Sequence, residues 1–332
     1  MNMAALKRSV AGLTFVLLSA LIMTTASERV YWYLGGATFD AFLAMAAYYA
    51  IPTLALLWAI GSGPSSRLHQ LVLGGAIFGF VVEGVLTPVV YEDGPLPLLA
   101  ALFVGWHGLV AFVGFWYFTR KWLLERRRLA LGVGSAALGL YWGVWSIVYT
   151  LPDALEDLDE VYPVMDPTDF GVDAVIVGLV FAAAHLLIGY VWPDGFRPGK
   201  WGRRGIVALL LGYASLAVLP AVPWAPVKFG VLVGGTLWLL RRSRATNPDE
   251  PTVMATLAGR VRPQDASLLL IAPVVAALSY AAVWSLELGD DAVQGIFASF
   301  SGAQVLAGLG AFVWAARRSL RRVAPSMSVT RA

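Results

Sequence analysis

Two ionisable residues lie deep inside apolar segments of this chain and could do chemistry together. Glu83 interrupts the apolar segment 70–91, and His107 interrupts the next one, 96–118. A carboxyl group in a low-dielectric setting keeps its proton unless a cation stabilises the charged form, and a neighbouring imidazole can accept that proton. The pair is therefore a candidate for handling protons. The alternative is a hydrogen bond that only joins two helices, which is common between membrane helices.

The spacing of the two residues predicts that they meet. They are 24 positions apart, and the midpoint, Pro95, falls in the turn 92–97, so two antiparallel helices would place them at similar depth. With a rise of 1.5 Å per residue, each would lie roughly 12–15 Å below the outer end of its helix, near the middle of a hydrocarbon core about 30 Å thick. An acid at this depth costs about 2.5–3.5 kcal/mol on insertion scales, which favours a functional role.

Small and polar residues recur on one face of each segment and would let the two backbones approach closely. They are Gly75, Gly79, Glu83 and Thr87 on the first segment, and Ala100, Val104, His107, Ala111 and Gly114 on the second.

Further residues are predicted to surround this pair. Glu28 lies near the outer end of the first apolar segment, and its neighbour Arg29 should point about 100° away and snorkel toward the headgroups. Glu28 would then be a second acid, lining an outward-facing cavity; interfacial anchoring is the alternative. The expected walls of the cavity are Tyr91, Trp142, Trp145 and Tyr149.

A third buried ionisable residue, His185, lies in the middle of segment 172–192 and is either a packing residue or a ligand. Phe181 and His185 repeat the Phe-x-x-x-His spacing of Phe103 and His107. That spacing is similar to one motif of the CPBP-type intramembrane proteases, and the resemblance implies a metal-assisted or acid–base hydrolase. Residues 83–88 contain neither the paired glutamates nor the arginine of that family, so no family is assigned on this basis.

Membrane-spanning helices are the elements predicted to position these residues. The chain has 332 residues, of which 58% are hydrophobic and 14% charged, against roughly 25% charged in soluble proteins. We predict an all-α, polytopic integral membrane helix bundle that forms a single domain over residues 1–332. Ten apolar segments are long enough, or nearly so, to span a bilayer: 10–33, 41–60, 70–91, 96–118, 129–150, 172–192, 205–222, 224–240, 266–285 and 293–316.

Three of these segments have a second interpretation. The pair 205–222 and 224–240 is joined by a tight proline-rich connection and could form a re-entrant element. The first segment follows Lys7 and Arg8 and resembles a secretory signal, whose cleavage would leave nine helices.

The distribution of basic residues predicts the orientation in the membrane. With the N-terminus inside, 22 of the 24 lysines and arginines fall on the cytoplasmic side, and only Arg29 and Lys228 lie outside. Both termini are then cytoplasmic. The residues 151–171 become an acidic external loop, and 241–265 a basic cytoplasmic loop.

These features leave three functions open. The first is a secondary transporter or permease of the cell membrane with a proton-handling Glu83–His107 pair. The second is an intramembrane enzyme acting on a lipid or other hydrophobic substrate, and the third is a non-catalytic scaffold subunit. The chain has no cysteine and no phosphate-binding Gly-x-x-x-x-Gly-Lys-Ser/Thr loop, and we predict no cofactor and no metal. The expected partners are membrane lipids, a small-molecule or lipid ligand, and other subunits of a homo- or hetero-oligomer, but no nucleic acid.

Overall fold

The computed structural model describes residues 3–30, 39–61, 63, 65–86, 96–150, 165–192, 200–213, 222, 225–244 and 251–321. Every regular element in these ranges is helical, and no strand occurs among the described residues. The predicted all-α class is therefore confirmed.

Eight helical stretches in the described part of the chain are long and apolar enough to cross a membrane. Several of them combine α-helical segments with π-helical or 3₁₀ segments. They are α1 (Met3–Thr24) with η1 (Thr25–Arg29), α2 (Phe39–Gly61), α3 (Leu68–Val81) with η2 (Val82–Leu86), α4 (Leu96–Phe103) with η4 (Val104–Phe118) and α5 (Thr119–Glu125), α6 (Arg128–Trp145) with η5 (Ser146–Thr150), α7 (Pro167–Leu187) with η7 (Ile188–Tyr190), α12 (Pro263–Ala266) with η10 (Ser267–Leu270) and α13 (Ile271–Trp284), and α14 (Asp290–Leu320).

The other two predicted spans, 205–222 and 224–240, are not among these eight stretches. Segment 205–222 contributes α8 (Lys200–Tyr213), which has 14 residues, and the positions 214–221 lie outside the described residues. Segment 224–240 belongs to a helix formed by α9 (Ala225–Phe229), η9 (Gly230–Gly234) and α10 (Gly235–Arg244). This helix carries Lys228 near its start and three arginines at its end, so it lacks a long uncharged stretch.

Two predicted loops also change. Helix α7 begins at Pro167, capped by Asp166, whose side chain accepts hydrogen bonds from the backbone N–H groups of Thr168 and Asp169. The end of the predicted acidic loop is thus helical, while 151–164 lie outside the described residues. The predicted basic loop 241–265 contains the end of α10, the short α11 (Val253–Thr256) and the start of α12.

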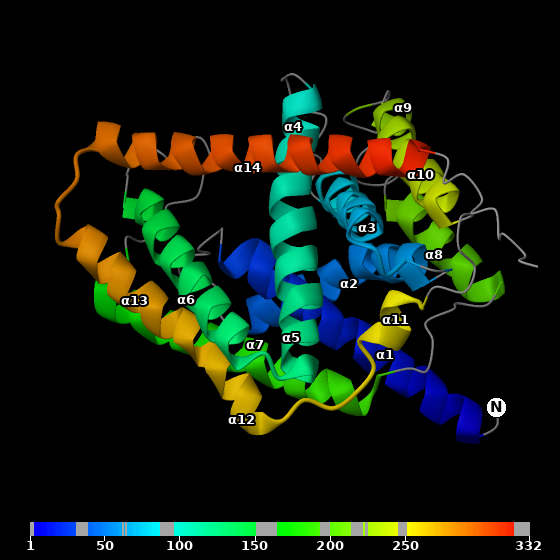
Figure 1. The fold of residues 1–332 in the computed structure, drawn as a ribbon, viewed down its shortest axis with the longest axis horizontal. Helices are drawn as coiled ribbons and strands as arrows, with labels where there is room; N and C mark the ends of the chain where they lie inside the picture. Colours follow the sequence, from blue (N-terminus) through cyan, green and yellow to red (C-terminus); the bar gives the residue numbers. More distant parts are fainter. Residues whose placement is uncertain are drawn as a thin grey trace, which may run out of the picture.

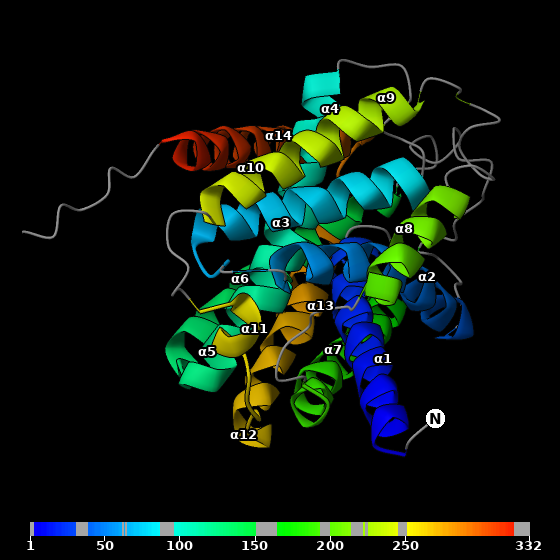
Figure 2. The ribbon, with the colours of Figure 1, turned by 90° about the vertical axis from the view of Figure 1, so that its right-hand side faces the viewer.

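Helix α3 lies at the centre of the bundle, and every residue from His69 to Val81 is buried. Figure 2 shows α3, α10 and α14 on one side and α1, α7 and α13 on the other. The α4–η4–α5 helix runs through the middle, and α14 crosses it (Figure 1). The apolar core has two large clusters. One contains Val72, Ile77 and Leu240, and the other contains Phe15, Val177 and Tyr280 together with Phe78 of α3, so α3 contributes to both.

Glycines allow the central helices to approach closely. A Cβ atom on Gly75 of α3 would lie 2.7 Å from the Cα and carbonyl oxygen of Gly108 in η4, and one on Gly79 would lie 2.7 Å from the carbonyl oxygen of Phe103. Gly105 of η4 and Gly308 of α14 likewise leave no room for a side chain where those helices cross. The face predicted for the second segment is thus partly wrong: Gly108 contacts Gly75, whereas Gly114 is only half-buried and its Cβ position would meet only its own helix.

Candidate functional site

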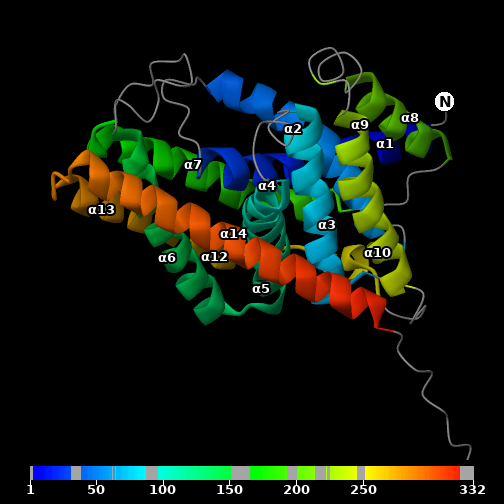
Figure 3. The same cartoon turned by 90° about the horizontal axis from the view of Figure 1, so that it is seen from above.

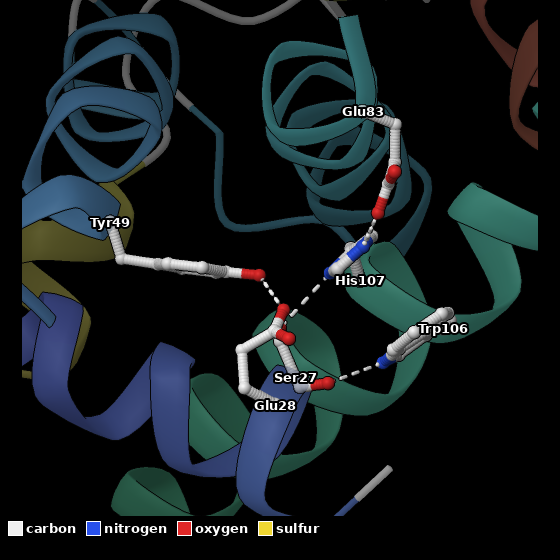
Figure 4. Close-up of polar contacts among 6 residues, drawn as sticks. All are labelled: Ser27, Glu28, Tyr49, Glu83, Trp106 and His107. Atoms are coloured by element: carbon white, nitrogen blue, oxygen red, sulfur yellow. Dashed lines mark hydrogen bonds and ion pairs between the residues drawn. The ribbon is translucent and has the colours of Figure 1, made fainter. Parts of the chain in front are cut away.

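The structure brings Glu83 and His107 into direct contact. Nε2 of His107 lies 2.6 Å from Oε1 of Glu83, and the two side chains come from η2 and η4 (Figure 4). His107 is fully buried and Glu83 is 6% exposed. A short contact between two buried groups of this kind is a charge-assisted hydrogen bond or its neutral equivalent, depending on which atom holds the proton.

The end of the first helix completes the surroundings of His107. Its second ring nitrogen, Nδ1, lies 3.0 Å from the hydroxyl oxygen of Ser27, which is fully buried. The neighbouring indole of Trp106 donates a hydrogen bond of 2.9 Å to the carbonyl oxygen of Ser27 and stacks on the imidazole. Both ring nitrogens of His107 therefore have a partner, and the ring is held in one orientation.

A second acid lies beside this pair. Glu28 follows Ser27 in η1, and its Oε1 accepts a hydrogen bond from the hydroxyl of Tyr49 in α2 (Figure 4). Glu28 is close enough to His107 and Glu83 to interact electrostatically with both. The prediction that Glu28 faces the bundle agrees with this geometry, but the partner Tyr49 had no signal in the sequence. We call Ser27, Glu28, Tyr49, Glu83 and His107 the polar cluster.

The two acids and the histidine of the polar cluster all lie on π-helical segments. Glu28 is in η1, Glu83 in η2 and His107 in η4. The wider π turn changes which side chains share a face, and π segments inside α-helices are frequent at functional sites. An α-helical periodicity does not reveal these segments.

The charge balance of the polar cluster defines its chemistry. It contains two carboxyl groups and one imidazole, so a protonated His107 neutralises only one carboxylate. The cluster is neutral when two protons are shared among Glu28, Glu83 and His107. Loss of one of these protons leaves a net negative charge among buried side chains, which is unfavourable in a low-dielectric setting. The charge of the polar cluster therefore depends on how many protons its three groups hold.

The prediction that Arg29 snorkels toward the headgroups is wrong. It is 7% exposed, pairs with Oδ1 of Asp173 in α7 at 2.5 Å and lies over the ring of Phe42. The acid that accepts this ion pair is 144 residues away in sequence, which is why the pairing could not be predicted.

The predicted aromatic walls lie elsewhere or are not described. Tyr91 lies outside the described residues, as does the side chain of Tyr149. Trp142 packs on Phe170 of α7, and Trp145 packs among Tyr141, Phe297 and Phe300. Both tryptophans are buried in contacts with α7 and α14 and take no part in the polar cluster.

His185 is also separate from the polar cluster. It is fully buried, its ring packs edge-on against Phe181, and its backbone carbonyl accepts a hydrogen bond from Arg120. Arg120 is itself fully buried and donates to the carbonyl oxygens of Leu257 and Gly259 as well. The two Phe-x-x-x-His stretches therefore do not bring their histidines to one site. Within the described ranges, no group of three or more His, Asp or Glu side chains is arranged to hold a metal ion.

An apolar cavity of about 310 Å³ lies between the η4–α5 helix, α6 and α7. Phe115, Trp122, Leu138 and Phe181 are among its lining residues. It contains no member of the polar cluster.

The long apolar helices and their buried polar cluster define a polytopic membrane protein built as a helix bundle. A stretch of 91 residues is 37% identical to a UPF0060 membrane protein of Rhodococcus jostii (strain RHA1), and the match covers 27% of this chain and 66% of that protein. The chain thus spans just under two thirds of the length of this relative. No protein-family model and no solved structure matches the chain.

Proposed function

We propose that this multi-pass membrane protein is a secondary transporter or permease of the cell membrane in which the polar cluster binds and releases a proton. The observation that carries the proposal is the 2.6 Å contact between Glu83 and His107 beside a second acid, Glu28. Three ionisable groups that share two protons have several arrangements of the same net charge. A change in the helix packing around them, on opening to one side or the other, would favour one arrangement over another.

The position of the polar cluster supports coupling to a movement of helices. Its members come from η1, α2, η2 and η4, so a shift of any one of these helices changes at least one hydrogen bond. A scaffold role needs only a stable contact, and for that purpose a buried acid is an expensive choice. The similarity to a membrane protein of R. jostii supports the membrane location alone.

The test is proton uptake by proteoliposomes that contain a pH-sensitive dye, after a pH difference or a membrane potential is imposed. We expect uptake with the wild-type protein and its loss in Glu83→Gln and His107→Gln. Glu287→Gln is the matched control, because Glu287 is an exposed acid outside the polar cluster and the chemical change is the same. Equal uptake by Glu83→Gln, Glu287→Gln and the wild type would contradict proton handling by this pair.

A further inference from the structure

A second cavity, which is polar and has a volume of about 400 Å³, is formed by the ends of three helices. Figure 3 shows the start of α3 and the ends of α10 and α14 gathered on one side of the molecule. The lining residues are Arg67, Leu68, His69, Ser243, Trp314, Arg318, Ser319 and Arg321. We call this cavity the basic pocket.

The basic pocket concentrates positive charge. Arg67 precedes α3, while Arg318 and Arg321 come from the end of α14 and the residue after it. Three arginine side chains thus line one pocket from regions about 250 positions apart in sequence. Among the described residues that line the pocket, none is acidic.

The neighbouring end of α10 adds to this charge. Arg241, Arg242 and Arg244 occupy its last turn. Burial and the charge of Arg241 lower the pKa of Arg244 to about 10, so this side chain stays largely protonated at neutral pH. Arg244 is already occupied by a hydrogen bond to the carbonyl oxygen of Ala59, so it adds to the field without lining the pocket. Like charges at this density repel, and a bound anion would offset that repulsion.

The shape and remaining lining favour a phosphate with an apolar part attached. A planar guanidinium donates paired hydrogen bonds that match phosphate oxygens. The volume lies at the lower end of the range of about 300–1,000 Å³ that small-molecule sites occupy. Trp314 and Leu68 are 39% and 46% exposed and give the pocket an apolar wall, with the ring of Trp314 held edge-on to His69. All three helix ends are on the side predicted to be cytoplasmic, where basic pockets between helices meet anionic headgroups.

We propose that the basic pocket binds a phosphate group, supplied by the headgroup of an anionic phospholipid. This proposal is independent of proton handling by the polar cluster, because the two sites share no residue.

The experiment is native mass spectrometry of the full chain in detergent, titrated with phosphatidylglycerol in one arm and with inorganic phosphate in the other. We expect Arg318→Gln to weaken phosphatidylglycerol binding roughly 10- to 100-fold, the loss that corresponds to one charge-assisted hydrogen bond. Arg317→Gln is the matched control, because Arg317 is exposed on the same helix turn, carries the same charge and does not line the pocket. Arg318 is itself exposed, so its replacement should not prevent folding.

The two arms distinguish the source of the phosphate. Binding of phosphatidylglycerol that millimolar inorganic phosphate does not displace supports the lipid headgroup. Binding of inorganic phosphate that Arg318→Gln abolishes, together with equal binding of phosphatidylglycerol by Arg318→Gln and Arg317→Gln, supports the phosphate site and overturns the lipid as its occupant. Equal binding of phosphatidylglycerol by Arg318→Gln and Arg317→Gln, with no binding of inorganic phosphate, overturns the site itself.

Discussion

Replacing Gly75 by alanine should push α3 and η4 apart at their closest approach. The new Cβ atom would lie 2.7 Å from two backbone atoms of Gly108. Carbon atoms in good contact lie about 3.5–4.0 Å apart, so the helices must separate by about 1 Å. Backbone atoms cannot turn away as a flexible side chain can, and the strain therefore falls on the helix pair as a whole.

The same displacement reaches the polar cluster. If η4 moves as a rigid body, the 2.6 Å contact between Glu83 and His107 lengthens to about 3.6 Å, at which it is no longer a hydrogen bond. Overpacking typically costs about 1–3 kcal/mol, and the higher helix propensity of alanine offsets about 1 kcal/mol of this. We expect Gly75→Ala to lose both stability and proton uptake.

The control for this prediction is Gly310→Ala. Gly310 lies in α14 with no atom within 4 Å of its Cβ position, so alanine gains helix propensity there without a clash. The difference in unfolding free energy between the two variants, measured by denaturant titration in detergent, isolates the overpacking term of about 1–3 kcal/mol. Equal stability of the two variants would refute the close approach on which the position of the polar cluster depends.

Two further predictions concern residues outside the polar cluster. Arg120→Ala should lower the unfolding free energy by about 3 kcal/mol, because three backbone carbonyls each lose a hydrogen bond of about 1 kcal/mol. The control is Arg127→Ala, at an exposed ion pair, which should change the unfolding free energy by less than about 0.5 kcal/mol. Denaturant titrations compare the two variants, and a similar small loss in both would contradict the role of Arg120. The hydrogen bonds from the N–H groups of Asp169 and Thr168 hold the pKa of Asp166 below its usual range. The carboxylate therefore stabilises the fold fully at a pH above its unfolded-state pKa of about 3.9, and this stabilisation is lost as the pH falls through the lower folded-state pKa. Asp166→Asn keeps an acceptor oxygen but does not titrate. The difference in stability between this variant and the wild type should be constant above about pH 5 and change only in acid. Thermal unfolding of both proteins from pH 2 to 7 measures this difference, and a change confined to neutral pH would count against the prediction.

The contact between Glu83 and His107 could be predicted because both residues interrupt apolar segments and a proline turn lies midway between them. That argument uses only positions along one hairpin. The partners supplied by other helices could not be predicted in the same way, because nearly every face of these helices is apolar and periodicity does not indicate which face meets which neighbour. Tyr49 and Ser27 are examples, since neither stands out among the polar residues of its own helix.

The errors have a common physical origin. Positions on single helices predict Arg29 at the headgroups and Trp145 at a cavity wall, whereas Asp173 and the phenyl rings of α14 determine where they lie. The face that includes Gly114 follows α-helical spacing, but in η4 the turn is wider. Charge and hydropathy identify the helices, but contacts between helices depend on shape.

The π-helical segments make the polar cluster sensitive to chain length as well as to residue type. A π turn contains about one residue more than an α turn, so deletion of a single residue from Val82–Leu86 would let this stretch close into a regular α-helix. The helix beyond the turn would keep its phase, but the side chains within the turn, Glu83 among them, would point in new directions. Such a protein could keep every side chain of the polar cluster and still turn Glu83 away from His107. Among homologous chains, an insertion or deletion at one of these turns can therefore disrupt the polar cluster as much as a substitution.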